Sequence, residues 1–164
     1  MKQCINILIK SGKIDALRKK YDRLFSKFKT HLTLVYPFEI TDQNALSRHI
    51  KNSIKSVKPF NATFNVVQKS TNGYIYLMAS DAEDNFMKLH NSLTSGILEK
   101  VDNPEMQKYI PHISLAVIEP ENLQDKAIEE INKINPNYEV HIDSVALLTL
   151  NEDLSIKSKK TFKL

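Results

Sequence analysis

The chain has 164 residues, of which 41% are hydrophobic and 26% charged, which is the size and composition of one domain with a buried core. Lysine and arginine total 23 against 19 aspartates and glutamates, and the resulting net charge of +4 favours anionic partners such as phosphates. A single cysteine, Cys4, excludes a disulfide framework and a cysteine-rich zinc cluster, and no apolar run reaches the roughly 20 residues that span a bilayer. We therefore expect a soluble, cytoplasmic and monomeric protein without a signal peptide.

Hydrophobic periodicity predicts alternating strands and amphipathic helices. In the first half of the chain, we expect a strand at 5–9, a helix at 14–28, a strand at 32–36 ended by Pro37, a helix from Thr41 or Asp42 to about Lys55, and a strand at 60–67. In the second half, we expect a strand at 74–79, a helix at 81–100, a strand at 113–118 and a helix from about 121 to 133. The chain then ends with strands near 138–150 and 155–162. The order of elements repeats from near Gln3 and from near Gly73. This repetition favours an α+β fold with two similar lobes, about 3–72 and 73–164, around a pseudo-twofold axis in one domain, 1–164.

The repeat is clearest in one short polar motif, which occurs once in each half. It reads His31-Leu32-Thr33-Leu34 in the first half and His112-Ile113-Ser114-Leu115 in the second. Side chains alternate along a strand, so each histidine shares a face with its hydroxyl residue while the aliphatic residues face the other way. A single motif of this kind is also explained by a half-buried histidine bonded to its neighbouring hydroxyl. Two motifs in register with a whole-chain repeat favour a functional pair.

Two histidines and two hydroxyls facing each other suit phosphodiester cleavage. A neutral imidazole removes a proton from the attacking water or hydroxyl, and a protonated imidazole supplies one to the leaving oxygen. Both forms coexist near neutrality because the unperturbed pKa of imidazole is about 6.5. The hydroxyls donate hydrogen bonds to the non-bridging oxygens of the phosphate. No metal is indicated, because no two histidines lie one helical turn apart.

The paired motifs, about 80 residues apart, resemble those of the 2H phosphoesterase superfamily, in particular its bacterial branch of 2'-5' RNA ligase-like proteins. Residues 14–22, the following THLTLVYPF and the segment from Tyr109 to Leu115 extend the similarity, although Thr30 stands where proline often precedes the first histidine. The resemblance implies a bilobal fold whose antiparallel sheets form a concave central cleft, with helices packed outside.

The same resemblance implies roles for four residues: His31 and His112 as acid and base, and Thr33 and Ser114 as phosphate-orienting hydroxyls. It implies activity on 2',3'-cyclic phosphates or 2'-5' linkages at the ends of RNA or in small cyclic nucleotides, with no metal or cofactor. It leaves open the substrate, the balance of hydrolysis and 2'-5' ligation, and which histidine is the acid.

Contacts to the rest of the substrate are harder to read from the sequence. By strand parity, Tyr76 lines the cleft and stacks on a base, with core packing as the alternative, and Asn6 is its equivalent in the first half. Lys108 and Tyr109 are candidates for contact with the ribose or phosphate, a surface role being the alternative. A rival to the enzyme is a binding module that holds RNA or a nucleotide in the same cleft without catalysis.

Overall fold

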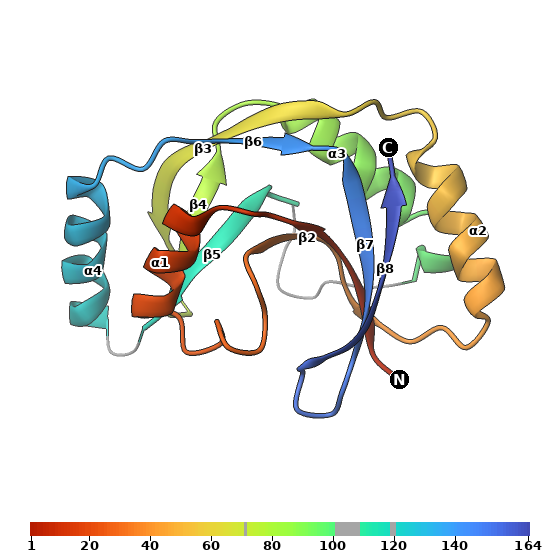
Figure 1. Cartoon of the computed structure of the whole chain (residues 1–164), viewed down its shortest axis with the longest axis horizontal. Helices are drawn as coiled ribbons and strands as arrows, with labels where there is room; N and C mark the ends of the chain where they lie inside the picture. The colour runs from red at the N-terminus through yellow and green to blue at the C-terminus, as the bar shows by residue number, and fades with distance from the viewer. Residues whose placement is uncertain (71, 101–108, 119–120) are drawn as a thin grey trace.

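The computed structural model describes residues 1–70, 72–100, 109–118 and 121–164, which form an eight-stranded antiparallel sheet with helices outside it (Figure 1). The strands follow the order β6-β3-β4-β5-β2-β1-β7-β8. Their bounds are β1 Gln3–Leu8, β2 His31–Phe38, β3 Phe60–Lys69, β4 Tyr74–Ala79, β5 His112–Val117, β6 Tyr138–Ile142, β7 Ser144–Leu150 and β8 Ile156–Lys163. The helices are α1 Gly12–Tyr21, α2 Gln43–Ile54, α3 Glu83–Leu93 and α4 Glu121–Lys133, with a 3-10 turn, η1, at Gly96–Leu98.

The sheet order is symmetric about its centre, where the two motif strands β2 and β5 pair through Leu32 and Ile113. Moving outward, β1 matches β4, β7 matches β3 and β8 matches β6. The predicted bilobal α+β fold with a pseudo-twofold axis is therefore confirmed. The sheet halves differ from the predicted lobes, however, because β7 and β8 complete the half that contains β1 and β2, while β3 joins the other half.

The two halves also share a local irregularity that sets the register of the centre. The β1–β2 ladder shifts between Ile5 and Asn6, and the β4–β5 ladder shifts between Ile75 and Tyr76. After these bulges, Asn6 pairs with Thr33, and Tyr76 pairs with Ser114. A bulge moves the side chains that follow it to the other face of the strand. Because both ladders are bulged at the matching point, Asn6 and Tyr76 occupy equivalent positions next to the two motif strands.

The apolar face of the central strands forms the core. Leu32, Leu34, Ile113 and Leu115 are fully buried, as expected from the alternation of the two motifs. Helix α3 packs on β2 and α1 on β5, so each motif strand is covered by a helix from the other half (Figure 1). Among the described residues, none of the helices is both long enough and apolar enough to cross a membrane.

Helix α1 ends at Tyr21, seven residues before the expected end at Phe28. Asp22 leaves the helical conformation, and its carboxylate accepts a hydrogen bond from the backbone N–H of Leu24 at 2.8 Å. The same carboxylate binds Arg18 one turn back. These contacts stop the helix, and the apolar residues after it turn toward the sheet instead of extending the helical stripe.

Three other element boundaries differ from expectation. Strand β2 continues through Pro37 to Phe38, because a bulge opposite β1 at this point spares Pro37 a ladder hydrogen bond. Helix α3 ends at Leu93, and Gly96, with φ of +57°, begins the separate turn η1. The strand expected near 138–150 is two strands on different halves of the sheet, β6 and β7, joined at Asp143. The expected start of α2 is confirmed, with Asp42 as its N-cap.

Candidate active site

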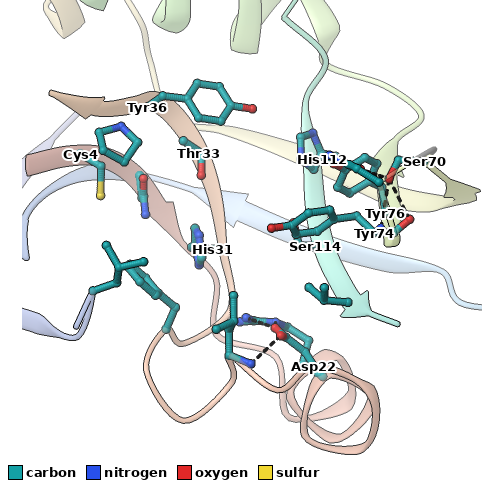
Figure 2. A pocket seen from close by; sticks show the side chains of 18 of the residues that line it. Cys4, Asp22, His31, Thr33, Tyr36, Ser70, Tyr74, Tyr76, His112 and Ser114 are labelled. Carbon is teal, nitrogen blue, oxygen red and sulfur yellow. Dashed lines mark hydrogen bonds and ion pairs between the residues drawn. The ribbon is translucent and has the colours of Figure 1, made fainter. Parts of the chain in front are cut away.

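A pocket of about 440 Å³ lies over the centre of the sheet and draws residues from both halves (Figure 2). His31 and Thr33 of β2 and His112 and Ser114 of β5 all line it. The structure therefore brings the two sequence motifs, 81 residues apart, to a single site. The polar side chains of the two motifs point into the pocket, and their aliphatic side chains point into the core.

The antiparallel register determines how the four side chains are arranged. Because Leu32 lies opposite Ile113, continuing the register places His31 opposite Ser114 and Thr33 opposite His112. Each histidine thus faces a hydroxyl across the strand boundary and meets the other histidine on the diagonal. Diagonal neighbours in an antiparallel pair have Cα atoms about 7–8 Å apart. That spacing leaves room for a phosphate between the two rings.

Both imidazoles are oriented by the same hydrogen bond. Nδ1 of His31 lies 2.7 Å from the carbonyl oxygen of Lys29, and Nδ1 of His112 lies 2.8 Å from that of Ile110. A carbonyl only accepts, so Nδ1 carries the proton in each ring. Nε2 is then the atom that exchanges a proton with a bound ligand.

Burial shifts both histidines toward the neutral form. Loss of solvation lowers the pKa of His31 to about 4, against the opposing effect of its bond to the carbonyl of Lys29. The positive charges of Arg18 and His112 contribute to the same lowering. Burial also lowers the pKa of His112, and its bond to the carbonyl of Ile110 opposes that shift. At neutral pH both imidazoles therefore favour the neutral form.

The walls beside the two histidines are different. The ring of Tyr76 lies 4.1 Å from that of His112, and Tyr74 stacks on Tyr76 at 5.8 Å. On the other side, Phe28 lies 5.4 Å from His31. Figure 2 shows the tyrosines at one end of the pocket and Cys4 at the other, with the histidines between them. The predicted positions of Tyr76 and Asn6 both line the pocket.

An ion pair that the sequence analysis missed forms part of the wall next to His31. Arg18 and Asp22 are buried and line the pocket, and their side chains meet at 2.5 Å. Arg18 also contacts Thr30, whose hydroxyl binds Asp15, so the pair fixes the backbone just before His31. The sequence did contain a sign of this ion pair. Arg18 and Asp22 have opposite charges and lie one helical turn apart, and Arg18 follows Leu17 on the apolar side of the helix.

Tyr109, which was predicted to contact a ribose or phosphate, is buried outside the pocket. It is only 7% exposed and is not among the pocket-lining residues. Its hydroxyl donates to the carbonyl oxygen of Thr33 at 3.0 Å, and its ring stacks on His90 at 4.0 Å. Tyr109 therefore supports β2 from beneath. Lys108 lies outside the described residues.

Other pocket residues escaped the sequence analysis because they come from turns and a distant strand. Pocket-lining residues of this kind are Cys4, Leu24, Phe28, Ser70, Asn72, Leu150 and Leu154. The pattern of a single strand identifies which face is polar but does not identify which loops reach that face. Within the described part of the chain, no group of three or more His, Cys, Asp or Glu side chains is placed to hold a metal ion.

Comparison with known proteins gives a consistent result. The family model of the 2'-5' RNA ligase superfamily matches residues 9–154. A Bacillus licheniformis protein named "Putative phosphoesterase" is 29% identical over 140 residues, covering 82% of this chain and 79% of its own. A Staphylococcus aureus protein named likewise is 29% identical over 164 residues, covering 92% and 90%.

Solved structures share the fold at low sequence identity. E. coli LigT in complex with 3'-AMP aligns over 99% of this chain and 98% of its own, with a TM-score of 0.61 and 15% identity. LigT has also been solved with NADP+, where the TM-score is 0.61, the identity 16% and the coverage 99% and 94%. TT0787 of Thermus thermophilus aligns over 98% and 97%, with a TM-score of 0.60 and 18% identity.

Proposed function

The chain belongs to the 2'-5' RNA ligase superfamily of 2H phosphoesterases, and on that premise we propose that it cleaves phosphodiesters by general acid–base catalysis with His31 and His112. The observation that carries the proposal is the symmetric placement of two imidazoles and two hydroxyls in one pocket. A phosphate between the rings is within reach of a base on one side and an acid on the other.

His31 suits the base because its pKa, lowered to about 4, keeps the imidazole neutral over most of the working pH range. Its Nε2 takes a proton from a water molecule as the water oxygen bonds to phosphorus. His112 acts as the imidazolium, whose population rises as the pH falls. Its Nε2 gives a proton to the leaving oxygen as the bond from phosphorus to that oxygen breaks. The products are a phosphate monoester and a free hydroxyl. Ligation follows when a hydroxyl of a second RNA end takes the place of water. His31 takes the proton of that hydroxyl as its oxygen bonds to the phosphorus of a 2',3'-cyclic phosphate, and His112 protonates the ring oxygen that leaves.

Thr33 and Ser114 supply the remaining contacts at phosphorus. Each hydroxyl lies across from the histidine of the other strand, where it donates a hydrogen bond to a non-bridging oxygen. The substrate groups beyond the phosphate meet Tyr76 on one side and Asn6 on the other. We infer that 2',3'-cyclic phosphates and 2'-5' linkages at RNA ends or in small nucleotides are the substrates, with no metal required.

The test is turnover of nucleoside 2',3'-cyclic phosphates and 2'-5' dinucleotides in the presence of EDTA, between pH 4 and 8. We expect cleavage that EDTA does not abolish. His141→Ala is the matched control, because His141 is an exposed histidine on β6 outside the pocket and its loss leaves the rate unchanged. Absence of turnover on every substrate would reject the proposal.

The rival function, a binding module, predicts a different result. It requires a tight complex with uncleaved RNA that survives His31→Ala. The structure offers an observation against it, because a binder gains nothing from two imidazoles with matching Nδ1 hydrogen bonds. Incubation of the wild-type protein with a 2'-5' dinucleotide, followed by chromatography, separates the two functions.

A further inference from the structure

The side chain of Asn6 has an acceptor without a partner. Asn6 is 1% exposed, lines the pocket, and its Oδ1 atom has no hydrogen-bond partner. Its amide group has a small effect on the Cys4 thiol, whose pKa it lowers against the larger effect of burial. Burial raises the pKa of that thiol to about 12, so Cys4 stays uncharged. The Asn6 oxygen is therefore the free end of the amide.

Such an oxygen is uncommon in a folded protein, because a buried acceptor without a hydrogen bond has lost its contact with water and gained nothing in return. Among the described residues, one other buried side-chain oxygen shares this state, Oε1 of Gln124, and it lies on α4 away from the pocket. Asn6, by contrast, sits beside Thr33 at the reacting centre. The oxygen is itself buried, so a ligand in the pocket supplies the missing donor once the Asn6 amide turns toward the pocket that this residue lines.

The surroundings of Asn6 are apolar. Cys4, Phe28 and Leu150 line the same part of the pocket and pack in one cluster, and we call these three with Asn6 the Asn6 alcove. Phe28 connects the alcove to the ring of His31. An apolar recess with a single acceptor fits a flat heteroaromatic ring that carries one amino group at its edge.

The opposite flank has different chemistry. Tyr74 and Tyr76 offer stacked rings there, and the nearby hydroxyl of Ser70 is already bonded to Asn72 and to the carbonyl of Tyr74. Strand β4, which carries the tyrosines, lies three strand spacings from β1, or about 14 Å. The proposed phosphate site thus lies between two different flanks. The tyrosine flank can stack on a base, whereas the Asn6 alcove can stack on a base and also accept a hydrogen bond from it.

We propose that the Asn6 alcove selects a nucleobase with an amino group at C6 of a purine or C4 of a pyrimidine, that is adenine or cytosine, on one side of the scissile phosphodiester. The inference rests on the proposed function for the position of the phosphate. The amino group donates to Oδ1 of Asn6. A keto group at the same ring position, as in hypoxanthine or uracil, places a second acceptor against that oxygen, and the site rejects it.

Binding to an inactive variant tests the proposal without catalysis. We would titrate His112→Ala with 2'-5' dinucleotides in which adenine is replaced by hypoxanthine or by N6,N6-dimethyladenine, with uracil as the other base. Replacement should weaken binding about 10–100-fold on one side of the phosphate and leave affinity unchanged on the other. Adding Asn6→Leu, which keeps the number and branching of the side-chain heavy atoms, should remove the difference. Equal affinities on both sides, or a preference that survives Asn6→Leu, would overturn the proposal.

The ratio of kcat/KM for adenine and hypoxanthine dinucleotides in the wild-type protein gives a second measurement that needs no variant. Turnover with no difference between the bases contradicts the alcove and leaves the proposed function standing. Selective binding that depends on Asn6, without turnover, supports the alcove and contradicts the proposed function. The two failures are therefore distinguishable.

Discussion

The two halves of the sheet present the same reacting groups within different walls. Each half contributes a histidine and a hydroxyl from one strand, each histidine binds the carbonyl two residues earlier, and each neighbouring strand has a bulge at the matching place. Around these common features, the first half has Phe28 and a buried ion pair beside His31, whereas the second half packs Tyr76 against His112.

This difference shows which part of a duplicated site must stay symmetric. In the proposed mechanism the phosphate needs two proton-transfer groups and two hydrogen-bond donors in fixed positions, and the shared register places the four side chains symmetrically. The groups on either side of a phosphodiester are not identical, so the walls are free to differ. The comparison is testable by changing equivalent residues in the two halves.

The largest effect is expected at the histidines. His31→Ala and His112→Ala should each lower kcat about 10²–10⁴-fold, because each removes one proton-transfer step. The double variant should lose little more than the worse single variant, since the two groups act in one step. The measurement is steady-state cleavage of a nucleoside 2',3'-cyclic phosphate. A loss at only one of the two histidines would contradict the symmetry of the site.

Arg18 tests the feature that is found only in the first half. Arg18→Met leaves the Asp22 carboxylate buried without its partner and should cost about 3 kcal/mol of unfolding free energy. Lys20→Met on the same helix is the control, because its ion pair with Glu130 is exposed and its loss should change stability little. Urea unfolding followed by circular dichroism measures both. Equal stability of the two variants would show that the buried pair is not a structural support of the pocket.

The hydroxyls should behave alike in the two halves. Thr33→Val and Ser114→Ala each remove one hydrogen bond to a charged phosphate, which is worth about 1.5–3 kcal/mol, or roughly 10–100-fold in kcat/KM. The thermal midpoint of each variant serves as the folding control. An effect confined to one hydroxyl would mean that the phosphate binds off the pseudo-twofold axis.

Substitutions in the walls of the pocket should have the smallest effects, and these should change KM more than kcat. Tyr76→Ala removes a stacking surface and should raise KM by the equivalent of about 1–3 kcal/mol, with little change in kcat. Phe28→Ala should do the same for the group on the other side of the phosphate. Kinetics with two dinucleotides of reversed sequence distinguish the sides. Identical changes for both sequences would contradict separate subsites.

The sequence predicted well which faces of the two motif strands are polar and which are buried, because that information is local. Alternation within His31-Leu32-Thr33-Leu34 specifies which side chains share a face, and the repeat at His112 identifies the partner strand. Strand pairing is not local. Nothing in residues 60–69 indicates that β3 joins the half of the sheet opposite to the strands before it.

Individual contacts set the limits of prediction in the same way. Helix α1 ends early because the Asp22 carboxylate binds Arg18 one turn back and the backbone N–H of Leu24, which are local side-chain contacts that hydrophobic periodicity does not record. Tyr109 was expected to contact the substrate because it lies shortly before His112. Its ring instead stacks on His90, and its hydroxyl donates to a backbone carbonyl of β2. Asn6 was expected at the site from symmetry alone, and the unpartnered oxygen that gives it a specific role emerges only in the packed structure.

The most direct test of the central claim is the pH dependence of kcat/KM for the wild-type protein and the two histidine variants. Both imidazoles have lowered pKa values in the free protein, that of His31 to about 4. We expect a bell-shaped profile with its maximum below pH 6.5, because the base is lost by protonation as the pH falls and the acid is lost by deprotonation as it rises. His31→Ala should abolish the acidic limb and His112→Ala the alkaline limb. A profile that keeps both limbs in either variant would contradict a two-histidine mechanism.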